Sequence, residues 1–246
     1  RGKTMSSLAI PTEKTKVTAM LGDQVIIIYG APKIGKSTFA SQFPNALFVA
    51  TEPGLSHLEV YQVPVTSWVQ FKHLCGVVAN DPLHIETLVI DTIDILYLQC
   101  FDAVCKEAGV EHPSDESHGK VWSMVSSEFR RVLARLSLLR TKDGKKMGLV
   151  MVSHVRIVDE ESRTGTRRSY AMNLSNSPRI IVTSMSDLYL FADVADDGSR
   201  VLRTKGTKSW AAGDRTGMLP ETMPLSYDAL SAAFSNALTK KNGEKK

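Results

Sequence analysis

Cysteine and aromatic residues are scarce in this chain, and it has no long hydrophobic run. Its three cysteines, Cys75, Cys100 and Cys105, lack the paired short spacing of zinc sites, so we expect reduced thiols in the core or on the surface. No apolar run approaches the roughly 18 residues of a membrane-spanning helix, and we find no secretory signal. We therefore expect a cytoplasmic protein without a membrane partner, with Met5 as its natural start and residues 1–4 as a remnant.

What the chain does contain is enough apolar material for a core. Hydrophobic residues make up 43% of the 246 residues and charged residues 23%, as in soluble globular proteins. This length suits one large domain or two small ones. The net charge of +4 permits a nucleic-acid partner without requiring one. A charge balance without functional meaning is the alternative.

Alternating apolar runs and amphipathic segments predict an α/β fold. The runs rich in Val, Ile and Leu are typical of strands buried on both faces of a parallel sheet; they are residues 25–29, 46–50, 87–91 and 147–153. The segments between them have helical character; they are residues 37–42, 67 onwards, 93–108 and 121–139. This alternation predicts a mainly parallel central sheet flanked by helices, without an internal repeat or a second domain.

Shorter signals complete the expected elements. Residues 63–65 suggest an edge strand, where proline is tolerated. In the helix that Ser67 opens, we expect an apolar face; its members are Val69, Leu74, Val77 and Val78. Residues 156–178 are polar and predict either a long loop or a β-hairpin. A strand at 188–192, a turn at 196–198 and a strand at 200–204 predict a hairpin, and a last helix follows at 227–239.

The segment 30–37, GAPKIGKS, matches the phosphate-loop pattern G-x-x-x-x-G-K-S. Its glycines allow backbone N–H groups to wrap a phosphate, and the next helix adds the positive end of its dipole. Lys36 would reach the terminal phosphates and Ser37 would bind Mg²⁺. The expected nucleotide ligands are Gly30, Ala31, Pro32, Lys33, Ile34, Gly35, Lys36, Ser37 and Thr38. A chance match in an ordinary loop is the alternative.

Two carboxylates follow buried strands close to this loop in the predicted sheet. Asp91 ends the run 88–90 and would hold Mg²⁺ through water, or it could instead cap the following helix. Thr92 occupies the next position, where many ATPases place a catalytic glutamate. Glu52 follows the second strand at the same expected edge, from which it could activate water as a general base. The alternative for Glu52 is an ordinary loop carboxylate.

Residues 49–55 (VATEPGL), read with the phosphate loop, resemble the RecA-like recombinase core. That resemblance implies that Glu52 is the catalytic base. Residues 152–156 (VSHVR) resemble the RecA segment in which an amide side chain senses the γ-phosphate and signals to DNA-binding loops. His154 stands where RecA has glutamine; it can still donate a hydrogen bond to phosphate. An ordinary histidine at a strand end is the alternative.

More narrowly, the chain resembles phage nucleotide-binding proteins with a minimal RecA core, including the phage single-strand annealing ATPases. The carrying motifs, in chain order over about residues 20–220, are GAPKIGKS, TEPG, VTSW, VIDT, HGKVW, SH and AGDR. The resemblance implies ATP-dependent binding and annealing of single-stranded DNA in recombination. It also implies ATP and Mg²⁺ bound between subunits of a homo-oligomer, ring or filament, often beside a single-strand DNA-binding protein. We expect a RecA-like P-loop core at 23–220, an arm at 1–22, and a helix with a basic tail at 221–246.

Basic residues in the second half of the chain fit that resemblance. The DNA-binding candidates, whose cations would follow phosphates and whose ring would stack on a base, are Arg156, Arg163, Arg167, Arg168 and Tyr170. A solvated loop is the alternative. The candidates to reach a neighbouring subunit's γ-phosphate are Arg203 and Lys205, whose alternative role is charge protection of an edge strand.

Two rival functions remain open at this point. One is a different P-loop protein, such as a helicase, a helicase loader or a small-molecule kinase. The other is a DNA-binding module that uses ATP as a switch with little turnover. We expect Trp68, Trp122 and Trp210 to be packing residues in any of these readings.

Overall fold

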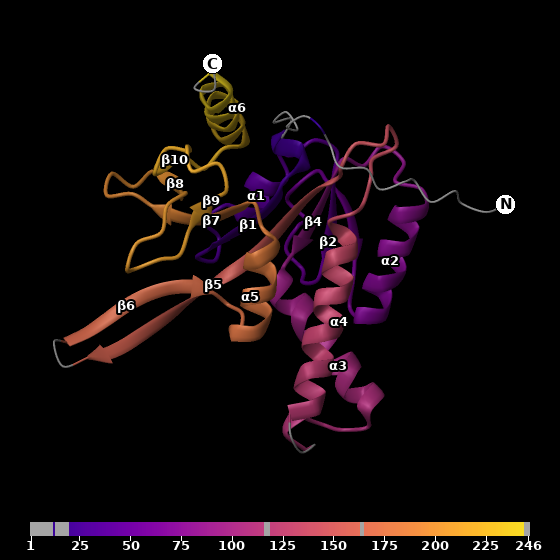
Figure 1. The fold of residues 1–246 in the computed structure, drawn as a ribbon. Coiled ribbons are helices and arrows are strands. Elements are labelled where there is room, and N and C mark those ends of the chain that lie inside the picture. The colour runs from indigo at the N-terminus through magenta and orange to yellow at the C-terminus, as the bar shows by residue number, and fades with distance from the viewer. Residues whose placement is uncertain (1–11, 13–19, 116–118, 163–164, 244–246) are drawn as a thin grey trace.

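A central β-sheet lies between two layers of helices in the computed structural model (Figure 1), which describes residue 12 and residues 20–115, 119–162 and 165–243. The strands are β1 Val25–Gly30, β2 Ala46–Ala50, β3 Tyr61–Pro64, β4 Thr87–Asp91, β5 Gly148–Ser162, β6 Gly165–Met172, β7 Leu188–Val194, β8 Arg200–Arg203, β9 Gly213–Asp214 and β10 Thr222–Pro224. The helices are α1 Lys36–Ala40, α2 Trp68–Asn80, α3 Ile93–Ala108, α4 Lys120–Leu136, α5 Asn176–Met185 and α6 Tyr227–Gly243, with 3₁₀ turns η1 Leu21–Asp23 and η2 Pro113–Asp115. The predicted α/β class is confirmed.

The first strand shows why these runs of residues become central strands. Val25, Ile27 and Tyr29 of β1 pack into the core formed with α2, α3, α4 and α5. Ile26 and Ile28 point the other way, into the core formed with α1 and α6. Both faces of the strand are covered, so every position is apolar, and the sequence shows a continuous run instead of an alternation.

The strand order places several strand ends at one edge. The order is β10-β8-β7-β1-β5-β4-β2-β3, and the pairs from β7 to β3 are parallel. Strand β5 lies between β1, which leads into the phosphate loop, and β4, which ends at Asp91. Because parallel strands end on the same side, the residues that follow β1 and β2, the end of β4 and the part of β5 at His154 meet along one edge, where ligands of open α/β sheets bind.

Helix α2 begins where expected but turns a different face inward. Ser67 is its N-cap, and the Ser67 hydroxyl accepts a hydrogen bond from the backbone N–H of Gln70 at 3.3 Å. Trp68 and Phe71 are buried together with Val78, whereas Val69 is 67% exposed and Val77 51% exposed. The predicted face through Val69 and Val77 is therefore wrong. Burial of the two large aromatic rings removes more apolar area from water than burial of two valines, so the rings set the helix orientation.

The polar segment after residue 153 is a β-hairpin followed by a helix. Strand β5 continues past the sheet and pairs antiparallel with β6, from Val155 opposite Met172 to Ser162 opposite Gly165. Figure 1 shows this hairpin extending away from the sheet as an arm. The hairpin was one of the two predicted forms. Helix α5, which follows it, was not predicted, because its start is rich in Asn, Ser and Pro and resembles a loop.

The described residues beyond residue 220, which end at residue 243, pack on the same body. Strand β10 pairs with β8, and Leu230 and Phe234 of α6 are buried in the core beside Ile26 and Ile28. Among the described residues, no helix has both the length and the apolar character to cross a membrane.

The cysteines are free thiols. Cys100 and Cys105 are buried and Cys75 is half-buried. Burial raises the pKa of the Cys75 and Cys100 thiols to about 12, so both stay protonated and unreactive at neutral pH.

Candidate active site

The predicted phosphate loop connects the end of β1 to the start of α1. Gly30 ends β1 in the middle of the sheet, where an added Cβ would lie 2.5 Å from the carbonyl oxygen of Ala192. Gly35 caps the helix with a φ of 109°, a conformation that favours glycine. Both glycines of the motif are therefore required by the backbone, and the strand–loop–helix arrangement expected for a phosphate loop is present.

Lys36 lies within this loop with little exposure to solvent. Its Nζ donates hydrogen bonds to the carbonyl oxygens of Gly30 and Ala31, both at 2.9 Å. Burial lowers its pKa, and the carboxylates of Asp91, Asp94 and Glu52 oppose that shift. A lysine ammonium has three N–H donors, so one remains for a phosphate oxygen.

Ser37 and Asp91 provide oxygen ligands beside the lysine. The Ser37 hydroxyl donates a hydrogen bond of 2.7 Å to Oδ2 of Asp91, which ends β4 and is 6% exposed. Burial raises the pKa of Asp91, while the Ser37 hydrogen bond and Lys36 lower it. A hydroxyl and a carboxylate are ligands that suit Mg²⁺, which is usually completed by water and substrate phosphates. The described residues contain no group of three or more His, Cys, Asp or Glu side chains that could hold a metal ion.

Glu52 and His154 come together at the same edge from two different strands. Glu52 follows β2, and its Oε1 lies 3.6 Å from Nε2 of His154 on β5. Burial raises the pKa of Glu52, and the charge of His154 opposes this shift. The two residues that the sequence proposed as base and phosphate sensor are thus neighbours, about the distance of a weak ion pair apart.

Asp94 was not predicted, and it holds His154 in place. It lies in the first turn of α3 and is 4% exposed. Its Oδ2 accepts hydrogen bonds from the backbone N–H of His154 at 2.8 Å and from the ring Nδ1 at 2.9 Å. The hydrogen bond to Asp94 raises the pKa of His154. A carboxylate in a first helical turn normally signals only a favourable dipole interaction, so the sequence carried no specific sign of this role.

These groups line one cavity of about 510 Å³ at the carboxyl edge of the sheet. From the phosphate loop and α1 it is lined by Pro32, Lys33, Gly35, Lys36, Ser37 and Thr38. The other predicted site residues that line it are Glu52, Asp91 and His154. Ile34 is different, because its side chain is buried in the core below the loop. Arg200, which was not among the predicted site residues, also lines the cavity.

The two residues predicted to act on a neighbouring subunit make contacts within their own chain. Arg203 donates to Asp193 at 3.1 Å and to Thr222 at 3.1 Å, and its guanidinium lies 5.4 Å from the ring centroid of Trp210. Lys205 pairs with Glu221 at 3.2 Å. Action on a second subunit would require these contacts to be exchanged.

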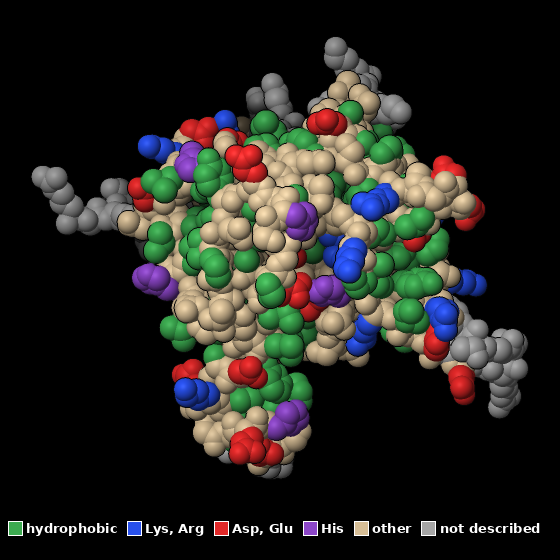
Figure 2. Space-filling view, turned by 180° about the vertical axis from the view of Figure 1, so that it is seen from behind, with side chains coloured by type: hydrophobic (Ala, Val, Ile, Leu, Met, Phe, Trp, Pro, Cys, Tyr) green, Lys and Arg blue, Asp and Glu red, His purple; other side chains and the backbone are tan. Residues whose placement is uncertain are grey.

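The DNA-binding candidates lie on or beside the hairpin arm. Arg156 is half-buried near the base of the arm, and Arg167 and Arg168 lie on β6, with Arg168 paired to Asp159 at 2.9 Å. Tyr170 is half-buried, and its ring stacks on Phe191 at 5.8 Å between centroids. Arg163 lies outside the described residues. On the face that Figure 2 shows, basic and acidic side chains are interspersed without a continuous basic surface, so DNA binding would depend on local groups.

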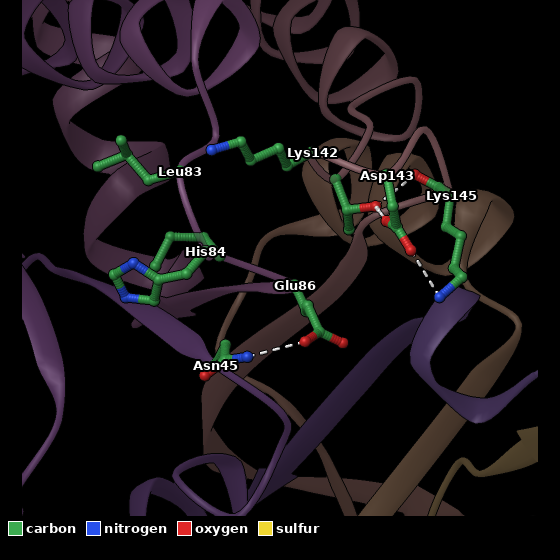
Figure 3. A pocket seen from close by; sticks show the side chains of 9 residues that line it. Asn45, Leu83, His84, Glu86, Lys142, Asp143 and Lys145 are labelled. Atoms are coloured by element: carbon green, nitrogen blue, oxygen red, sulfur yellow. Dashed lines mark hydrogen bonds and ion pairs between the residues drawn. The ribbon is translucent and has the colours of Figure 1, made fainter.

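A second cavity, of about 600 Å³, lies at the opposite edge of the sheet (Figure 3). Three of its charged side chains have partners in the chain: Glu86 accepts from Asn45 at 2.7 Å, and Asp143 pairs with Lys145 at 2.6 Å. None of the predicted phosphate or metal ligands lines it. The carboxyl edge is therefore the better candidate for nucleotide chemistry, although its cavity is smaller.

Comparison with known proteins gives two findings. A family model described as an AAA domain matches residues 23–216, most of the chain. The SPbeta prophage-derived uncharacterized protein YorG of Bacillus subtilis (strain 168) is 22% identical over 201 residues. The alignment covers 78% of this chain and 57% of that relative, so the chain spans little more than half of the relative's length.

Proposed function

This chain belongs to the AAA domain family of P-loop ATPases, and we propose that it couples ATP hydrolysis to the binding and annealing of single-stranded DNA. Family membership supports nucleotide binding and hydrolysis, usually with Mg²⁺. The DNA, the annealing and the assembly go beyond the family match and are our proposal.

One observation carries the proposal: strand β5 connects the hydrolytic residues to the hairpin arm. His154 lies on β5 within 3.6 Å of Glu52 and 2.9 Å of Asp94. Only one residue further, at Val155, the same strand begins to pair with β6 as the arm. A change in the contacts of His154 during hydrolysis would therefore act directly on the base of the arm.

For hydrolysis, each side chain has a separate task. Lys36 holds the terminal phosphates by charge, and Glu52 orients a water molecule and accepts its proton. The raised pKa of Glu52 makes its carboxylate a better proton acceptor than an exposed carboxylate. Ser37 and Asp91 would hold Mg²⁺, which would neutralise phosphate charge. His154, with Nδ1 occupied by Asp94, presents Nε2 to Glu52 and to the γ-phosphate side.

For DNA, the arm offers cations on an extended, accessible element. Arg167 and Arg168 lie on β6 near its outer end, where they could follow the phosphates of a single strand, as strand-binding grooves do. Arg163, the third candidate, lies outside the described residues. Tyr170 lies towards the base of the arm, so any stacking on a base would require the ring to leave Phe191. The prophage origin in the relative's name supports a phage context. The proposal further includes a homo-oligomer acting in the cytoplasm beside a single-strand DNA-binding protein.

The test is ATPase activity and particle size with and without ATP and single-stranded DNA, for the wild type and for Lys36→Ala. We expect DNA to stimulate hydrolysis and ATP to change the oligomer, with both effects absent in Lys36→Ala. A hydrolysis rate that does not respond to single-stranded DNA, together with a particle size that does not change with ATP or DNA, would refute the proposal. Duplex unwinding would favour a helicase, and tight ATP binding with negligible turnover, unaffected by Glu52→Gln, would favour an ATP switch.

A further inference from the structure

The side chain of Arg200 lies over the phosphate loop. An added Cβ on Gly35 would lie 3.3 Å from Nη1 of Arg200 and 3.5 Å from Cδ2 of Leu225. The two side chains therefore lie together over the loop just before Lys36. The Arg200 guanidinium is exposed and makes no ion pair or hydrogen bond with the part of the chain that the structure describes.

The backbone fixes these two residues next to each other. The N–H of Leu225 donates to the carbonyl oxygen of Arg200 at 3.0 Å, just beyond the pairing of β8 with β10. Arg200 itself is paired with Val194 at the carboxyl end of β7. Both residues thus belong to a hydrogen-bonded part of the sheet, so the backbone keeps the Arg200 and Leu225 side chains next to each other.

The strand order gives this surface a place relative to a nucleotide. Glu52 follows β2, Asp91 ends β4 and His154 lies on β5. These three strands lie on one side of β1. Arg200 begins β8, which lies on the other side of β1. A nucleotide whose γ-phosphate faces Glu52 and His154, with its phosphates in the loop after β1, must extend its other end towards β7 and β8.

We propose that Arg200 and Leu225 bind the nucleoside end of the nucleotide in the same subunit, with the base against the Leu225 side chain and the Arg200 guanidinium. A planar guanidinium stacks well on an aromatic ring and is more weakly hydrated than a lysine ammonium. Leu225 adds an apolar contact of the kind that lines most nucleotide pockets. This inference rests on the proposed nucleotide binding and adds the subsite that the sequence did not identify.

This role differs from that of an arginine that stabilises the transition state. A nucleoside contact is the same before and during hydrolysis, so its loss weakens binding of substrate and product alike. A γ-phosphate contact would instead distinguish ATP from ADP and would appear in kcat.

The experiment measures binding of ADP, a non-hydrolysable ATP analogue and inorganic tripolyphosphate by calorimetry. The variants are Arg200→Ala, Arg200→Lys and Leu225→Ala, with melting temperatures to confirm folding. Arg130→Ala, an exposed arginine on α4, is the matched control. Lys36→Ala is the positive control for binding at the phosphate loop, because it should weaken the binding of all three ligands.

We expect Arg200→Ala to weaken the binding of ADP and of the ATP analogue by the same factor, about tenfold, which corresponds to the loss of one stacked cation. Arg200→Lys should fall between that variant and the wild type, and tripolyphosphate binding should not change. In steady-state assays the loss should appear in KM. Unchanged affinities, a loss confined to the ATP analogue, an equal loss for tripolyphosphate, or a fall in kcat alone would each overturn the subsite. A wild type that binds neither nucleotide would refute the proposed function itself.

Discussion

The Nε2 atom of His154 lies 3.6 Å from Oε1 of Glu52, although the two residues are 102 positions apart in the chain. Nδ1 of the same ring is held by Asp94 at 2.9 Å, so the orientation of the ring is fixed from behind. The neighbour of the proposed base is therefore a positioned imidazole, whose protonation changes the charge that Glu52 meets. Several consequences of this contact can be measured.

Replacing Glu52 with glutamine should abolish hydrolysis and preserve nucleotide binding. The amide keeps the size of the side chain but cannot accept a proton from water, a loss of about 10²- to 10⁴-fold for a general base. Glu59→Gln, on an exposed residue of the same loop region, is the control and should hydrolyse ATP normally. Phosphate release and ADP or ATP binding are the measurements. Residual turnover close to that of the control would exclude Glu52 as the base.

Asp94→Asn should lower the pKa of His154 towards its ordinary value. The largest cause of the raised pKa is the hydrogen bond to Asp94, and an amide does not stabilise a protonated imidazole as a carboxylate does. Histidine proton resonances followed by NMR across a pH titration measure this shift. Asp102→Asn, an exposed position of the same helix, should leave the titration unchanged. An unaltered His154 titration in Asp94→Asn would contradict the assigned contact.

The same contact makes a signed prediction for stability. Because the folded-state pKa of His154 is raised, its contribution is fully present below the unfolded pKa and is lost as pH rises through the folded pKa. The free energy of unfolding of the wild type, measured with denaturant, should therefore fall as the pH rises over that window. In Asp94→Asn the fall should be smaller. If both proteins lose stability in parallel over that window, another group is responsible.

Gly30→Ala should destabilise the fold by about 1–3 kcal/mol, the usual cost of forcing an extra carbon into a packed core. The added Cβ would lie 2.5 Å from a backbone oxygen of Ala192 on β7, which cannot move without disturbing the sheet. Gly76→Ala is the matched control, because nothing lies within 4 Å of its Cβ position in α2. That control should be neutral or slightly stabilising. Equal melting temperatures for the wild type and Gly30→Ala would show that β1 and β7 can move apart to admit the added carbon, and would contradict the prediction.

Replacing Arg163 and Arg167 with alanine should weaken single-stranded DNA binding and flatten its salt dependence. Each lost phosphate contact should reduce the slope of log K against log salt by about 0.7. Fluorescence anisotropy at several salt concentrations measures both effects, and nucleotide binding should be unaffected. Arg130→Ala again serves as the control. An unchanged slope would mean that the arm does not contact DNA phosphates.

The central strands and the phosphate-loop arrangement could be predicted because their physical signals are local. The run at 87–91 and the helix at 93–108 were assigned with the bounds that the structure has, since a strand buried on both faces is apolar at every position. The phosphate loop was found because its backbone requires glycine at fixed positions. These features depend on neighbouring residues alone.

The remaining features depend on contacts between distant segments. In the sequence, Asp94 has only the features of an acidic residue at the start of a helix. Its hydrogen bond with His154 forms because the fold brings β5 next to α3, which no local pattern predicts. Arg200 and Arg203 are equivalent in sequence, three positions apart on one strand. Register decides between them, because it places Arg203 beside Asp193 and leaves Arg200 at the end of β7 beside the loop.

The length of β5 has a mechanical consequence. Strand β5 pairs with β1 as far as His154 and with β4 as far as Val152, whereas the stretch from Val155 to Ser162 pairs only with β6. At about 3.3 Å per residue, that stretch is a lever of ~26 Å, so a tilt of ~10° at His154 would carry its end by ~5 Å. A displacement at the phosphate too small to matter by itself would thus become, at the far end of the arm, a movement comparable to the spacing between two strands of a sheet.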